Sequence, residues 1–130
     1  MNTKNVWLAF ALISAAGCGG SGGGATGVPP GVNTPPPVGG ISVENNVFTP
    51  SAKTVTAGTT VQWAWNSCEA GGVYGGGGTC VTHNVVFDDG TTSGPKDQGT
   101  YSRTFAAAGT YPYHCSLHGT AMSGSITVTP

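Results

Sequence analysis

Charged side chains are scarce in this sequence. Lys and Arg together number 4 and Asp and Glu 5 among 130 residues, so 7% of the chain is charged and the formal net charge is −1. Globular proteins usually carry about a quarter of charged residues. A chain this neutral offers no basic surface to the phosphates of a nucleic acid or to an anionic membrane. We therefore expect neither of these to be a direct partner.

Long apolar runs are also lacking. The longest covers residues 6–16 and has eleven residues, whereas a membrane-spanning helix needs about 20. The run follows Lys4 and ends at small residues before Cys18, which is typical of an export signal and resembles the lipobox of bacterial lipoproteins. We predict a signal peptide over residues 1–17 and a lipid on Cys18. The alternative is a plain secretory signal cleaved near Ala16 or Gly17.

That leader places the mature protein outside the cytoplasm, in the periplasm or cell envelope, with the lipid on Cys18 as its contact with the membrane. Residues 18–40 follow as a tether, since 14 of the 22 residues from 19 to 40 are Gly or Pro and none is charged. Residues 41–130 remain for one domain, which suits the usual size of a single domain.

Residues with high helix propensity are few, whereas Thr, Val and Gly abound. Residues 59–66 alternate so that Val61, Trp63 and Trp65 share one face, which indicates a half-buried strand. Short segments of this kind with turns between them predict an all-β, antiparallel Greek-key sandwich of six to eight strands. The expected segments lie near 41–43, 53–57, 59–66, 85–87, 101–105, 110–115 and 125–129.

Soft metal ligands cluster near the C-terminus. Cys115, His118 and Met122 lie within eight residues, in a segment that we expect to be a loop directly before the last strand, and His83 opens an earlier strand. Two imidazoles, one thiolate and a weak axial thioether are the ligands of blue-copper electron-transfer sites. His114 is the nearest competitor, but on an extended strand it points away from the side of Cys115.

The domain resembles the small blue copper proteins, or cupredoxins, nearest the plastocyanin and amicyanin branch. The resemblance implies His83, Cys115 and His118 as equatorial ligands of one copper ion and Met122 as the axial ligand. It also implies that Asn84 braces the ligand loops and that Tyr111 forms a tyrosine corner. It rests on Val47–Pro50, Ala57–Trp63, His83–Phe87, Ala108–Tyr111 and the loop with Cys115, His118 and Met122.

The function implied by the resemblance is one-electron transfer, by a monomer whose redox protein partners dock near Leu117 and His118. Storage or delivery of copper is the alternative use of the same ion. An enzyme is not expected, because the chain shows one copper constellation, no second histidine cluster and no nucleophile–base pair.

Cys68 and Cys80 bracket an insertion over residues 66–82 where most relatives have a short turn. If Cys115 binds copper, these two are the only cysteines after the leader left to form a disulfide, which an exported compartment permits. Cys80-x-x-His83 and Cys115-x-x-His118 could instead form a structural Cys2His2 zinc site. A metal-free sandwich that serves as an interaction module is a further possibility.

Overall fold

The computed structural model describes residues 33–69 and 78–130. The predicted signal peptide, Cys18, most of the tether and the centre of the insertion lie outside these ranges. In the described ranges every regular element is a strand, and no helix there could span a membrane. The strands are β1 (Ile41–Glu44), β2 (Val47–Thr49), β3 (Ala52–Thr56), β4 (Thr60–Trp65), β5 (Val86–Phe87), β6 (Thr100–Thr104), β7 (Gly109–Cys115) and β8 (Gly119–Thr129).

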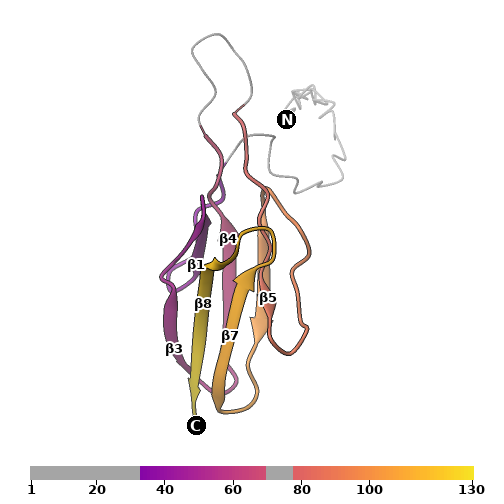
Figure 1. The fold of residues 1–130 in the computed structure, drawn as a ribbon. Helices are drawn as coiled ribbons and strands as arrows, with labels where there is room; N and C mark the ends of the chain where they lie inside the picture. Colours follow the sequence, from indigo (N-terminus) through magenta and orange to yellow (C-terminus); the bar gives the residue numbers. More distant parts are fainter. Residues whose placement is uncertain (1–32, 70–77) are drawn as a thin grey trace, which may run out of the picture.

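The strands form two four-stranded sheets, with the orders β2-β1-β4-β6 and β3-β8-β7-β5 (Figure 1). The predicted all-β sandwich is therefore confirmed. Each sheet is mixed, however, because β1 pairs with β4 and β3 pairs with β8 in parallel, while the other pairs are antiparallel. Parallel neighbours arise where the chain crosses to the other sheet before it returns, as Greek-key connections do.

The core lies between the sheets and is centred on the aromatic ring of Trp63. The pattern of β4 buries Val61, Trp63 and Trp65, as the alternation of the sequence predicts. The Trp63 ring makes edge contacts with Tyr113 and Phe87, at centroid distances of 5.5 and 5.7 Å. Such edge-to-face pairs add to the free energy of apolar burial.

Gly124 on β8 lies where Tyr113 leaves no room for a side chain. A Cβ atom at this position would lie 2.5 Å from Cζ of Tyr113 and 2.7 Å from the carbonyl oxygen of Ser51. The phenol ring of Tyr113 therefore packs directly on the backbone of the neighbouring strand. Burial also raises the pKa of Tyr113 to about 12.

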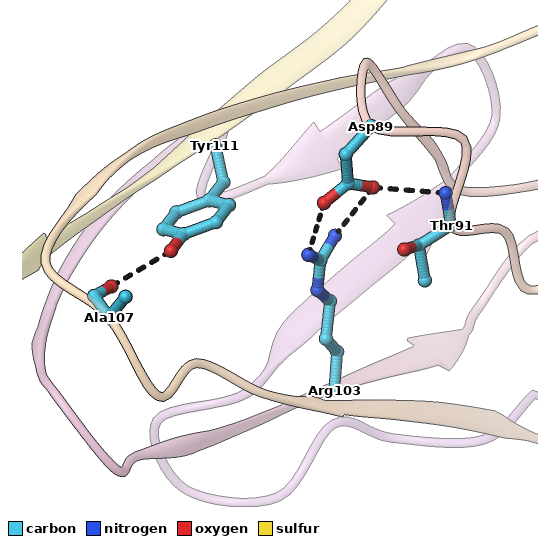
Figure 2. Close-up of polar contacts among 5 residues, drawn as sticks. All are labelled: Asp89, Thr91, Arg103, Ala107 and Tyr111. Carbon is cyan, nitrogen blue, oxygen red and sulfur yellow. Dashed lines mark hydrogen bonds and ion pairs between the residues drawn. The ribbon is translucent and has the colours of Figure 1, made fainter.

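Polar contacts hold the end of the sandwich where β7 begins, and they join Tyr111 to Ala107 and Arg103 to Asp89 (Figure 2). The Tyr111 hydroxyl donates a hydrogen bond of 2.9 Å to the carbonyl of Ala107, the contact that a tyrosine corner makes. Arg103 lies over the ring of Phe87, 4.1 Å from its centroid, and pairs with the carboxylate of Asp89. These contacts fix the start of the strand whose other end carries Cys115.

Contacts with the domain begin before residue 41, where the sequence analysis places its start. Asn33 exchanges two hydrogen bonds with the backbone of Cys68, and the Thr34 amide donates to the Trp65 carbonyl at 2.8 Å. The last residues of the predicted tether are thus part of the folded domain.

Candidate metal centre

Three potential metal ligands meet at one end of the sandwich. Cys115 is the last residue of β7, His118 lies in the three-residue connection to β8, and His83 precedes β5. The Nδ1 atoms of the two histidines are 3.2 Å apart, and Sγ of Cys115 lies 3.4 Å from Nδ1 of His118 and 3.9 Å from Nδ1 of His83. Among the residues that the structure describes, this is the only such group of His, Cys, Asp or Glu.

The geometry of these donor atoms fits a metal ion. The three distances define a triangle whose corners are each about 2 Å from a common centre, close to the lengths of metal–nitrogen and metal–thiolate bonds. One thiol and two imidazole nitrogens that converge in this way match the equatorial set of a blue-copper site. The residues present therefore fit copper.

The potential ligands differ in their burial, and burial affects the protonation of His83. The side chains of His83 and Cys115 are fully buried, whereas His118 is partly exposed. Burial lowers the pKa of His83, and the nearby His118 lowers it further. His83 is consequently a neutral imidazole at neutral pH, which is the form that binds a metal.

The backbone of His83 is held from two sides. Its amide and carbonyl exchange hydrogen bonds of 2.8 and 2.9 Å with Lys96, and its carbonyl also accepts one of 3.3 Å from the indole N–H of Trp65. Sequence reasoning assigns Trp65 to the core and gives no role to Lys96. The one feature of the sequence that points to this contact of Trp65 is that a buried indole N–H needs a hydrogen-bond acceptor.

Asn84 links the two segments that carry the ligands. Its side-chain amide donates to Oγ of Ser116 and its side-chain oxygen accepts from the Ser116 amide, both at 2.8 Å. The Asn84 amide also lies 3.5 Å from Sγ of Cys115. These are contacts that a bracing residue makes, and they add Ser116, which sequence reasoning missed because nothing distinguishes it from any serine beside a ligand.

Met122 lies in a strand, not in the loop before it. The pairing of β7 and β8 shifts from His114 with Ser123 to Cys115 with Gly119, so the residues between Gly119 and Ser123, Met122 among them, are extra residues of a bulge in β8. Met122 is 1% exposed and belongs to the same buried cluster as Cys115. The bulge thus places a thioether in the core near the end of the sheet that carries the ligands.

The remaining candidates lie apart from this centre. His114 alternates with Cys115, is only half buried and pairs with Val86. Cys80 forms a disulfide with Cys68, so it is not available to a Cys2His2 zinc site, and that hypothesis is wrong. Cys115 is the free cysteine in the described part of the chain.

Comparisons with known proteins agree with this geometry. The model of a family described as copper-binding proteins, plastocyanin/azurin family, matches residues 39–129. A plastocyanin from Scenedesmus fuscus is 38% identical over 96 residues, which cover 63% of this chain and 86% of the plastocyanin.

Solved structures agree in fold. A variant of amicyanin is 27% identical, with a TM-score of 0.55 over 69% of this chain and 80% of amicyanin. A purple cupredoxin from Nitrosopumilus maritimus shares the fold at 23% identity, with a TM-score of 0.55 over 69% of this chain and 98% of its own. A copper-containing nitrite reductase from Thermus scotoductus is 26% identical, with a TM-score of 0.56, over 70% of this chain but only 22% of the reductase.

Proposed function

This chain belongs to the plastocyanin/azurin family of copper-binding proteins, and from that premise we propose that it carries single electrons between redox partners outside the cytoplasm. Its cofactor is copper. The observation that carries the proposal is the convergence of one buried thiol and two imidazole Nδ1 atoms, all within 4.8 Å of one another.

His83, Cys115 and His118 would hold the copper, with the Met122 thioether as a fourth, weaker ligand. Bound copper would supply a one-electron couple between Cu(I) and Cu(II). Thiolate and thioether favour the reduced ion and imidazole suits both, so this ligand set serves either oxidation state.

The surrounding residues keep the ligands in place while an electron arrives or leaves. Asn84 joins the His83 segment to the Cys115–His118 turn, and Lys96 and Trp65 hold the backbone of His83. Buried ligands that are fixed by hydrogen bonds move little and exclude water. A site that does not rearrange is suited to electron transfer, whereas a storage or delivery site must open to release its ion.

The proposed point of contact with partners is His118 with Leu117. His118 is the ligand that is partly exposed, and Leu117 beside it is 54% exposed. Residues 116–121, the connection and the first residues of β8, include no Asp, Glu, Lys or Arg. A small, uncharged and partly apolar surface favours brief docking with little electrostatic steering.

An electron carrier is favoured over an enzyme. This chain spans 22% of the nitrite reductase that shares the fold, so the activity of that enzyme is not carried over to it. In the described segments, one group of possible metal ligands is found.

The disulfide between Cys68 and Cys80 supports a location outside the reducing cytoplasm, in agreement with the predicted export signal.

Voltammetry and stopped-flow spectroscopy of the copper-loaded protein test the proposal. A carrier should give a reversible one-electron wave, and the copper should stay bound through repeated cycles of oxidation and reduction. A chelator of Cu(I) that strips the reduced protein as fast as the electron is delivered would instead support storage or delivery.

A further inference from the structure

The segment that leads from the predicted membrane anchor joins the domain at the copper end. The Thr34 amide donates a hydrogen bond to the carbonyl of Trp65, which is the last residue of β4. The indole N–H of Trp65 in turn donates to the carbonyl of His83. The Thr34 hydroxyl also accepts a hydrogen bond of 3.3 Å from the amide of Gly99. Asn33 and Thr34, which we call the entry clamp, therefore fasten the incoming chain beside the ligand His83.

The entry clamp lies outside the part of the chain that matches the family, which begins at residue 39. It is built on side chains as well as backbone, since the Asn33 amide group both donates to the Cys68 carbonyl, at 3.1 Å, and accepts from the Cys68 amide, at 2.7 Å. Cys68 is itself fixed by its disulfide. The clamp thus holds the incoming chain to a disulfide-bonded residue of the domain.

The C-terminus lies at the other end of the sandwich. In Figure 1 the β7–β8 connection, which carries His118, is at one end of β8, and the chain terminates at the opposite end. β8 has 11 residues, which at about 3.3 Å per residue corresponds to on the order of 30 Å. A membrane anchor at the C-terminus would place the copper end far from the bilayer. An anchor that leads into the entry clamp places the copper end close to it.

We propose that the entry clamp turns the electron-exchange surface at Leu117 and His118 toward the membrane, so that the partner is a membrane-confined protein whose redox centre lies close to the bilayer surface. This inference rests on the proposed copper function and on the predicted lipid anchor at Cys18. Cys18 and Asn33 are 15 residues apart, and a Gly-rich chain of that length has a root-mean-square span of about 20 Å, with an upper limit of about 50 Å.

The uncharged exchange surface supports this choice of partner. From Cys18 onward the chain carries three basic and five acidic side chains, so it has little long-range field to draw a freely diffusing partner. A short tether can promote the encounter without electrostatic attraction, because it confines the domain to the membrane and so raises the effective concentration of any partner within its reach.

The test compares two ways of attaching the copper-loaded protein to phosphatidylcholine vesicles. In one, a chain that starts at Cys18 is coupled through Cys18 to a maleimide lipid. In the other, Cys18 is replaced by Ser and a new Cys follows Pro130 at the end of an identical 15-residue linker. The reduced protein is then mixed with ferrocenium carried on a lipid, or with water-soluble ferrocenium, each of which takes one electron from Cu(I) and becomes ferrocene.

We expect the N-terminal attachment to react with lipid-borne ferrocenium on the order of fivefold faster than the C-terminal attachment. The soluble oxidant should react equally with both. The double variant Asn33→Ala with Thr34→Ala, which removes the side-chain hydrogen bonds of the entry clamp and leaves the backbone bond from residue 34 to Trp65, should give an intermediate rate with the lipid-borne oxidant. Equal rates for the two attachments would overturn the inference. Absence of a thiolate-to-Cu(II) charge-transfer band from the oxidised protein, recorded before ferrocenium is added, would refute the copper function, and the inference with it.

A second readout needs no copper. Trp63 and Trp65, both in β4, are the tryptophans that remain once residues 1–17 are removed. After the copper is removed, energy transfer from these residues to dansyl lipids reports how near this part of the domain lies to the vesicle. Transfer should be stronger for the N-terminal attachment, and equal transfer would contradict the proposed orientation.

Discussion

Replacement of Asn84 by Ala should weaken the protein through one identifiable set of contacts. The substitution removes both hydrogen bonds of 2.8 Å between Asn84 and Ser116. A hydrogen bond contributes about 1 kcal/mol net, so the free energy of unfolding of the copper-free protein should fall by about 2 kcal/mol. Because Asn84 joins the two segments that carry the ligands, copper affinity should also fall, by roughly 10- to 100-fold.

Ser116→Ala is the matched control. It removes the bond to the serine hydroxyl but leaves the bond from the Ser116 amide to the side-chain oxygen of Asn84, so it should cost about 1 kcal/mol. In the Asn84→Ala background the same change should cost almost nothing, because its partner is already gone. The double-mutant cycle should therefore give a coupling energy of about 1 kcal/mol.

Urea unfolding of the four copper-free proteins measures these energies, and competition with a chelator measures the copper affinities. The reasoning is refuted if the two substitutions are additive, or if Asn84→Ala leaves the copper affinity unchanged. Either result would mean that the bonds between Asn84 and Ser116 do not hold the ligand segments together.

Three further results are expected. Replacing both Cys68 and Cys80 by Ala should lower the free energy of unfolding by roughly 3 kcal/mol, because it opens a loop that the disulfide closes over a sequence separation of 12. The copper chromophore should remain, and its loss would argue against the proposed ligands. Gly124→Ala should destabilise the fold by about 1–3 kcal/mol, since the new Cβ meets Tyr113 and the carbonyl oxygen of Ser51; an unchanged urea midpoint would contradict that packing. Hydrogen bonds, first from Arg103, hold the pKa of Asp89 well below its usual range, so its stabilisation is complete above pH about 4 and fades as pH falls further. Asp89→Asn should flatten the unfolding profile in that acidic range, and an unaltered profile would show that the pair contributes nothing.

Much of the fold could be predicted from the sequence because its strands carry clear alternation. Val61, Trp63 and Trp65 mark β4 by themselves. The parallel pairs could not be foreseen, since the choice of neighbours in a sheet depends on contacts between distant segments. β2 has three residues with one buried side chain, too few for any periodic signal.

The candidate site, like the fold, could be predicted from the sequence only in part. Residue types and spacing suggested Cys115, His118 and Met122, with His83 as the second imidazole, and the resemblance assigned each of them its role. The strand position of Met122 was not foreseen, because a bulge depends on the register with the partner strand. Ser116, Lys96 and the entry clamp contribute through hydrogen bonds between distant segments, and residue types such as Ser and Lys give no sign of such contacts.

The visible spectrum of the purified protein after addition of Cu(II) tests the central claim most directly. If His83, Cys115, His118 and Met122 hold copper as proposed, the protein should bind one ion and become intensely coloured through charge transfer from the Cys115 thiolate. Cys115→Ser should abolish the colour, and Cys68→Ala with Cys80→Ala should retain it. A colourless Cu(II) complex of the unaltered protein, or colour that survives in Cys115→Ser, would contradict the account.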